Sequence, residues 1–296
     1  MSKRSLALLS GIFVALLYGL TFTYAKQVMN GFVKPYGFIL LRIIGASLLF
    51  WAISFLGPKE KIDKQDYKYI IICAFFGLRL NMLTFFKGLD YTTPISASVI
   101  MITTPMLVLL LSALFLKQKI VLRKSIGISI GLIGTTILIT YGKQSLGSGS
   151  NVALGNLLVF INAASYAAYM IIVKRLIEKY HAFTFIKWMY GVATIFILPF
   201  GLNELSQIHW SALPTDIIFK IIYVIVGATF ITYLLNLFVI RELKPTTASV
   251  FIYLQPLFAT IISLLLGSDQ LTKEKLIAAL LIFIGVYLVS KPEKTS

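Results

Sequence analysis

Long apolar runs follow one another along the whole chain, and the charged residues gather in short segments between them. Each run holds roughly 17 to 23 residues, close to the ~20 residues that a helix needs to cross a bilayer. We therefore predict an all-α integral membrane protein with ten transmembrane helices, the first of them retained rather than cleaved as a signal peptide. The predicted spans are about 6–26, 36–56, 68–88, 94–116, 123–141, 154–174, 183–201, 217–239, 246–267 and 274–290.

One apolar run recurs in the second half of the chain. Pro94–Leu116 matches Pro245–Gly267 at a shift of 151 residues, and 11 of the 46 positions aligned from Pro94 onward are identical. Self-similarity of this kind indicates a structural repeat. We predict two repeats, residues 1–143 and 152–291, with five spans each. Because five is odd, the second repeat must enter the membrane inverted relative to the first, an arrangement typical of transporters.

The distribution of Lys and Arg predicts the orientation. With a cytoplasmic N-terminus, eighteen of these residues lie in inside segments and seven in outside segments. Short loops rich in Lys and Arg remain in the cytoplasm. We therefore predict a multi-pass protein of the cytoplasmic membrane with both termini cytoplasmic and the segment Lys143–Asn151 outside.

The amino-acid composition limits the kinds of binding partner that the protein can have. Hydrophobic residues make up 58% of the chain and charged residues only 13%, about half the charged share of soluble domains. The net charge of +16 could suggest nucleic acid, but the basic residues lie in short loops that orient spans, so we expect a lipid bilayer and a small-molecule substrate instead. The single cysteine, Cys73, excludes an internal disulfide, and His181 and His209 lie far apart, so we expect no metal and no cofactor. Monomer and homodimer both stay open.

The sequence resembles a known family. The segments GLDYTTPISASVIMITTPMLVLLLSALFLKQKI and ELKPTTASVFIYLQPLFATIISLLLGSDQL are similar to the two EamA-type repeats of the drug/metabolite transporter superfamily. The resemblance implies ten spans, cytoplasmic termini and movement of small metabolites or amino acids by alternating access, usually outward. The family commonly has Glu after the fourth and ninth spans, where this chain has Gln118 and Asp269.

Two prolines hold matching places in the repeat. Pro105 and Pro256 each leave a carbonyl one turn back without its donor and so bend or loosen the helix. A neighbouring hydroxyl or cavity water satisfies such a break, and Thr103 and Thr104 precede Pro105. We interpret both prolines as helix hinges beside a cavity. The alternative is a permanent, inert kink.

Polar residues within the spans are the candidate solute ligands. Arg79 lies about eleven residues into the third span, hence ~15 Å along the helix, where a charge is normally functional. No span carries Asp or Glu in its middle, so we expect an anionic group of the solute to sit near Arg79; the alternative is an arginine satisfied by backbone carbonyls. The predicted substrate-binding residues are Arg79, Arg42, Tyr18, Asn81, Tyr166, Tyr253 and Gln255.

Three classes of function fit a polytopic membrane protein. The repeat favours a secondary transporter of small organic metabolites, with amino acids or related anionic or zwitterionic solutes as cargo and export as the direction. A polytopic enzyme acting on a lipid-like substrate is the alternative, but it would need a carboxylate or histidine cluster, and the sequence contains no H-E-x-x-H grouping. A structural subunit is the third class.

Overall fold

The computed structural model describes residues 2–58, 60–116, 122–141, 151–243 and 249–290, and these ranges are helical with short connections and contain no strand. The predicted all-α class is therefore confirmed. The α-helices are α1 (Lys3–Met29), α2 (Pro35–Ile53), α3 (Tyr67–Ala74), α4 (Asn81–Tyr91), α5 (Pro94–Met101), α6 (Thr104–Leu116), α7 (Leu122–Tyr141), α8 (Val152–Lys179), α9 (Ala182–Ser206), α10 (Thr215–Ile222), α11 (Thr232–Leu243), α13 (Gln255–Leu265) and α14 (Lys273–Ser290).

Two π-helical segments connect α-helices within continuous spans. The segment η3 (Phe75–Leu80) joins α3 to α4, and η5 (Tyr223–Ile231) joins α10 to α11. The remaining short elements are 3₁₀-helices: η1 (Ser54–Leu56), η2 (Lys64–Asp66), η4 (Trp210–Ala212) and η6 (Ser249–Leu254).

Seven helical segments among the described residues are long and apolar enough to cross a membrane: Lys3–Met29, Pro35–Leu56, Lys64–Tyr91, Pro94–Phe115, Val152–Lys179, Ala182–Ser206 and Thr215–Leu243. A shorter apolar helix covers Phe251–Leu265. Large apolar side chains such as Leu48, Ile195 and Phe219 are exposed on these helices, as expected for surfaces that face lipid. The count of ten spans stays a prediction.

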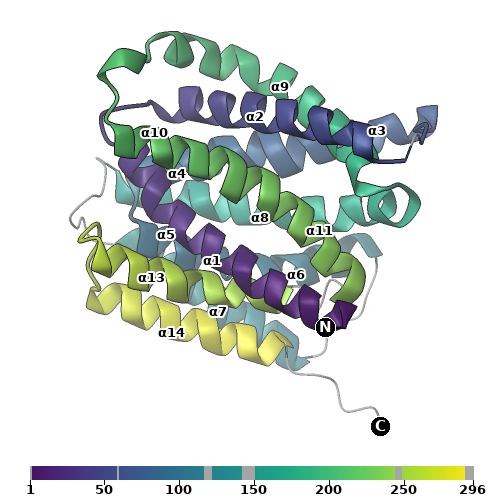
Figure 1. The fold of residues 1–296 in the computed structure, drawn as a ribbon. Helices are drawn as coiled ribbons and strands as arrows, with labels where there is room; N and C mark the ends of the chain where they lie inside the picture. The colour runs from purple at the N-terminus through teal and green to yellow at the C-terminus, as the bar shows by residue number, and fades with distance from the viewer. Residues whose placement is uncertain (1, 59, 117–121, 142–150, 244–248, 291–296) are drawn as a thin grey trace.

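The helices lie side by side in one elongated bundle (Figure 1). α2 packs against α9 along one edge of the bundle, and α7 packs against α14 along the opposite edge (Figure 1). α1 begins, and α11 and α14 end, at one end, which we call the Lys3 end; α2, α10 and α14 begin at the other, which we call the Met29 end (Figure 1).

The α7–α14 pair meets through glycines at matching positions of the repeat. A methyl group on Gly134 would come within 2.9 Å of the carbonyl oxygen of Ala278, and one on Gly285 within 2.5 Å of that of Gly127. A shift of 151 residues carries the first contact onto the second, since it places Gly134 on Gly285 and Gly127 on Ala278. Only glycine lets these backbones approach so closely.

The α2–α9 pair is tied at both ends by carboxylates. Glu60, beyond α2, accepts hydrogen bonds of 2.8 Å from the backbone N–H of His181 and the hydroxyl of Thr184 at the start of α9. Glu204, in the last turn of α9, accepts bonds of 2.7 and 2.9 Å from the N–H groups of Tyr36 and Gly37 at the start of α2. Free N–H groups at a helix N-terminus favour a negative partner. Each helix is therefore capped by a residue that follows or ends the other.

Candidate functional site

A cavity of about 110 Å³ lies inside the bundle between α1, α4, α8 and α11. The mixture of aromatic, methionine and amide side chains around it is typical of a small-molecule site. Its lining residues are Val14, Ala15, Tyr18, Thr21, Phe22, Arg42, Asn81, Met82, Phe85, Met101, Asn162, Tyr166, Met170, Tyr233, Asn236, Phe251, Ile252 and Gln255.

Arg42 contributes the cavity's charge. Its side chain comes from α2, is 6% exposed, and donates from Nε to the hydroxyl of Thr229 and from Nη2 to the carbonyl of Ala228 at 3.3 Å. Both acceptors belong to η5, and the guanidinium carbon also lies 5.1 Å from the centre of the Phe86 ring. No Asp or Glu pairs with Arg42 in the part of the chain that the structure describes. The contacts hold the guanidinium in place and leave its charge uncompensated.

Two asparagines join the halves of the chain beside the cavity. The side-chain amide of Asn162 donates to the carbonyl of Asn81 at 2.8 Å, and that of Asn81 donates to the carbonyl of Asn162 at 3.4 Å. The side-chain oxygen of Asn162 is buried and has no hydrogen-bond partner within the described part of the chain. A buried acceptor without a donor is costly, so this oxygen is suited to a solute that brings an N–H group.

A second cavity, of about 590 Å³, shares Tyr18, Tyr166, Met170, Tyr233 and Asn236 with the first. From these residues it extends to Lys174, Glu178, Lys179 and Arg241, whose side chains are exposed at the ends of α8 and α11. The second cavity thus adjoins the inner one and reaches the surface at the Lys3 end, where several cations line it; we call it the vestibule.

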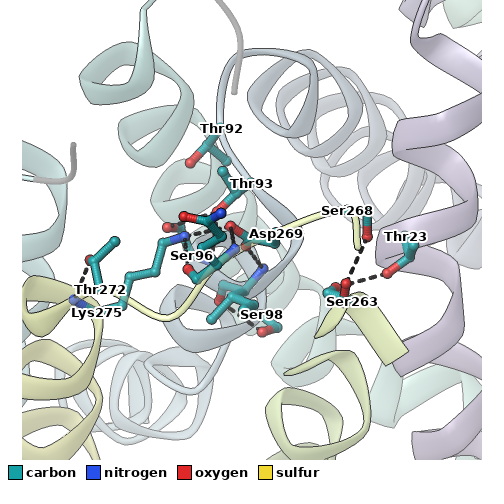
Figure 2. Close-up of polar contacts among 12 residues, drawn as sticks. Thr23, Thr92, Thr93, Ser96, Ser98, Ser263, Ser268, Asp269, Thr272 and Lys275 are labelled. Carbon is teal, nitrogen blue, oxygen red and sulfur yellow. Dashed lines mark hydrogen bonds and ion pairs between the residues drawn. The ribbon is translucent and has the colours of Figure 1, made fainter. Parts of the chain in front are cut away.

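At the Met29 end, buried contacts join the two halves of the chain. Lys275 pairs with Asp269 at 2.6 Å, and both side chains are buried, at 3% and 0% exposure. The second oxygen of Asp269 accepts the backbone N–H of Ile95 at 3.0 Å, in the first turn of α5 (Figure 2). Thr23 of α1 bonds Ser263 of α13 at 2.9 Å. We call Asp269, Lys275 and the start of α5 the Met29-end seal.

Lys26 adds a further closing contact at the Met29 end. It donates to the carbonyl of Leu89 at 2.8 Å and to that of Asp90, both in the last turn of α4. A cation at a helix C-terminus satisfies carbonyls that have no partner within the helix. The end of α1 is thereby fastened to the end of α4.

A model of the EamA-like transporter family matches two stretches of the chain, residues 5–140 and 153–291. The chain belongs to the EamA-like transporter family. The resemblance stated from the sequence is therefore confirmed, and the protein is a multi-pass membrane transporter rather than an enzyme.

Three relatives of this EamA-like chain are similar to it over most of their length. It is 26% identical over 272 residues to an uncharacterized transporter of Archaeoglobus fulgidus, covering 92% of this chain and 94% of the relative. It is 25% identical to the uncharacterized transporter YoaV of Bacillus subtilis, covering 94% of both, and 24% identical to a WAT1-related protein of Arabidopsis thaliana, covering 89% of this chain and 79% of the relative. A solved crystal structure shares the fold with a TM-score of 0.63 at 17% identity, covering 97% of both chains.

Five of the seven predicted solute ligands of this EamA-like protein line the inner cavity: Arg42, Tyr18, Asn81, Tyr166 and Gln255. Tyr253 lies in η6 and does not line the cavity; its neighbours Phe251 and Ile252 in the same element do. Apolar lining residues such as Phe85, Met101 and Met170 were missed, because an apolar side chain within a long apolar run carries no signal of its own.

Arg79 does not line the inner cavity, so the structure does not bring it together with the other predicted solute ligands. Its guanidinium carbon lies 5.2 Å from the ring centre of Phe75, 5.6 Å from that of Phe196 and 5.3 Å from that of Phe200. The last two rings belong to α9, so Arg79 points towards the α9 side of its span, and Arg42 is the arginine of the cavity.

The two predicted helix hinges fall where the helices break. α5 ends at Met101 and α6 begins at Thr104, directly before Pro105; η6 gives way to α13 at Gln255, directly before Pro256. The hydroxyl of Thr104 donates to the Met101 carbonyl at 2.7 Å, replacing the N–H that Pro105 lacks. Met101 and Gln255 line the cavity, so both breaks adjoin it.

Replacing Pro105 or Pro256 with alanine should leave the protein inserted and folded, because alanine is a good helix former, and should slow transport several-fold by straightening the break. Initial rates of solute counterflow in vesicles holding equal amounts of protein measure the effect. Pro199, inside α9 and away from the cavity lining, is the matched control, and its alanine variant should transport at the normal rate. Normal rates in both hinge variants and in the double variant would make the kinks inert.

Proposed function

We propose that this protein is a secondary transporter that exports small zwitterionic or anionic metabolites, amino acids above all, across the cytoplasmic membrane by alternating access. One observation carries the proposal: a buried arginine with no acidic partner among the described residues lines a cavity that adjoins a larger one at the Lys3 end, while buried contacts join the two halves of the chain at the Met29 end. An alternating-access transporter without bound solute is expected to have a central site that is accessible from one side of the membrane and closed to the other.

The chemistry of the cavity supports an amino acid as cargo. A guanidinium holds a carboxylate through two parallel hydrogen bonds, and Arg42 lacks any carboxylate of the described chain. The unpaired oxygen of Asn162 accepts an N–H, as the ammonium of an amino acid would provide. Tyr18, Tyr166 and Tyr233 offer rings to an apolar or aromatic side chain.

Two inverted repeats of five spans are also part of the proposal. The family model matches the chain twice, over residues 5–140 and 153–291. The glycine contacts between α7 and α14 are reciprocal: a glycine of each helix packs against a backbone carbonyl of the other. The carboxylate caps between α2 and α9 are reciprocal in the same way, because each helix start is capped from the other helix or the segment after it. Reciprocal contacts of this kind are expected when a two-fold axis in the membrane plane relates two halves.

Both termini are proposed to be cytoplasmic. α1 begins and α14 ends at the same end of the bundle (Figure 1), which agrees with an even number of spans. The excess of Lys and Arg assigns this Lys3 end to the cytoplasm. The vestibule then opens to the cytoplasm, where an exported solute must enter.

A topology assay is expected to give opposite results at two positions. A reporter active only outside the cytoplasm should work when fused after Gly149 and fail after Ser296, whereas a cytoplasmic reporter should show the reverse. The physical reason is the preference of basic loops for the cytoplasm. Cytoplasmic activity after Gly149 would contradict the inverted repeats, since residues 143–151 connect them.

Vesicle transport tests the function itself. Purified protein is reconstituted into vesicles loaded with one unlabelled amino acid at a time, and uptake of the same labelled amino acid is followed against protein-free vesicles. Counterflow of at least one amino acid, with no counterflow of a permanent organic cation, is the expected result. Equal rates with and without protein across the amino acids, or ready exchange of the cation, would overturn the proposed cargo.

A further inference from the structure

We infer that Arg79, with the rings of Phe75, Phe196 and Phe200, forms a site on the lipid-facing surface that binds the phosphate of an anionic phospholipid. The site lies between η3 and α9 and is separate from the solute cavity, whose lining does not include these four residues. The proposal concerns a lipid partner and stands independently of the solute.

The surroundings of Arg79 identify this surface as one that faces lipid. Ile71 and Ile72, in the turn before Phe75, are 45% and 37% exposed. On the opposing helix, Ile195 and Leu198 flank Phe196 and are 71% and 41% exposed. Exposed apolar side chains at the level of the membrane face acyl chains, so Arg79 lies among groups that lipid covers.

The guanidinium of Arg79 is only partly satisfied by the protein. The three rings, whose centres lie 5.2 to 5.6 Å from its central carbon, attract the cation through their faces. The five N–H groups of arginine lie in the plane of the guanidinium and still require acceptors. Within the described residues, no carboxylate and no hydrogen-bond acceptor contacts Arg79.

The Phe200 edge of the site lies near the depth of a lipid head group. Phe200 precedes the end of α9 at Ser206 by six residues, or about 9 Å of helical rise, and the polar Asn203 and Glu204 follow it within about one turn. The Phe200 ring also lies 6.4 Å from that of Tyr36, the second residue of α2. Arg79 itself precedes the end of α4 at Tyr91 by twelve residues, or about 18 Å of helical rise, so its long side chain has to extend past the Phe200 ring towards the Met29 end to meet a head group.

A phosphodiester fits these donors. It carries one negative charge and accepts two parallel hydrogen bonds from a guanidinium, and its acyl chains would lie over the exposed Ile195 and Leu198. A lipid with net negative charge is expected to bind in preference to a zwitterionic one, whose choline places a cation beside the phosphate. Because Phe196 and Phe200 belong to α9 and Phe75 to η3, a bound lipid would join the two elements.

Native mass spectrometry of the full-length protein tests the site. The protein in detergent is titrated with phosphatidylglycerol and, separately, with phosphatidylcholine, and the first bound lipid is counted. The wild type should bind its first phosphatidylglycerol at a lipid concentration roughly tenfold or more below the concentration of phosphatidylcholine that gives the same occupancy. Arg79→Gln should remove this preference, and Arg79→Lys, which keeps the charge but loses the planar fork, should retain part of it.

Two further variants keep the test decisive. Phe200→Leu retains the charge and removes one ring, so it should weaken the preference even if Arg79→Gln fails to fold. Lys34→Gln removes an exposed cation at the same end of the bundle, which donates to the side-chain oxygen of Gln207 at 2.9 Å, and it should bind both lipids as the wild type does. An unchanged preference in both folded Arg79→Gln and Phe200→Leu, or an equal loss in Lys34→Gln, would overturn the site.

Discussion

Arg42→Gln is expected to lower counterflow of a carboxylate-bearing amino acid by roughly 10- to 100-fold, because hydrogen bonds to a charged group contribute about 1.5–3 kcal/mol and each 1.4 kcal/mol is tenfold. Glutamine keeps a hydrogen-bonding head but loses the charge and the planar fork. The protein should still fold, since Thr229 already donates its own hydroxyl to the Val224 carbonyl at 2.7 Å. The measurement is the initial rate of exchange in vesicles with equal amounts of folded protein.

Two comparisons separate anion binding from a general defect. Arg42→Lys keeps the charge without the bidentate geometry, so its rate should fall between those of wild type and Arg42→Gln. Arg79→Gln, in vesicles of neutral lipid, removes a membrane arginine that lies outside the cavity and should exchange the amino acid at the wild-type rate. A loss in Arg79→Gln as large as that in Arg42→Gln, or no loss in Arg42→Gln, would contradict the assignment of the anion to Arg42.

The arginines show where prediction from the sequence stops. Depth along a helix follows from counting residues, and the count placed Arg79 near the middle of its span. The direction of a side chain depends on helical phase, and η3 contains Arg79 itself. A π-helical segment adds a residue to the turn, so the ordinary periodicity of 3.6 no longer tells which face Arg79 occupies.

The burial of Arg42 depends on the second half of the chain. From the sequence it lies about 9 Å into its span, where a long side chain can reach the interface. In the structure the side chain turns inward, because η5 presents the Thr229 hydroxyl and the Ala228 carbonyl to it. These acceptors lie 186 and 187 residues away in sequence, and no local pattern predicts that contact.

The helix breaks, by contrast, follow from local chemistry. Proline removes an N–H wherever it stands, and the repeat placed Pro105 and Pro256 at equivalent depths, so both breaks and the compensating hydroxyl at Thr104 were predictable. From the sequence, Asp269 was noted only as the residue that stands where the family commonly has Glu after the ninth span. Its burial requires the N-terminus of α5 from the first half, as the N–H of Ile95 shows. Gln118, which holds the matching place in the repeat, lies outside the described residues.

Asp269→Asn is expected to open the Met29 end. The change leaves Lys275 buried without its partner, which costs about 3–5 kcal/mol, and it weakens the acceptor for Ile95. In alternating access, the Asp269–Lys275 pair is broken in the conformation that is open at the Met29 end. The substitution therefore destabilises only the conformation that is closed at that end. The population should therefore shift towards the state open at the Met29 end.

Thiol labelling measures that shift. Thr21 lines the cavity from α1 beyond Tyr18 towards the Met29 end, so Thr21→Cys in a Cys73→Ala background reports access from that end. A membrane-impermeant thiol reagent applied there should label the Asp269→Asn protein at least roughly tenfold faster than its parent. Solute counterflow should fall as well, because a transporter biased towards one conformation completes fewer cycles.

A second ion pair at the same end supplies the control. Asp216 pairs with Lys220 at 2.7 Å within the single helix α10, and its side chain is 63% exposed. Such a surface pair contributes about 0–1 kcal/mol and joins no two elements, so Asp216→Asn should not change labelling. Asp269→Asn/Lys275→Met removes both charges of the pair, so neither is left buried without the other, and labelling should return part of the way to the parent rate. Faster unfolding of Asp269→Asn with unchanged labelling would instead mean that the pair stabilises both conformations equally and takes no part in access.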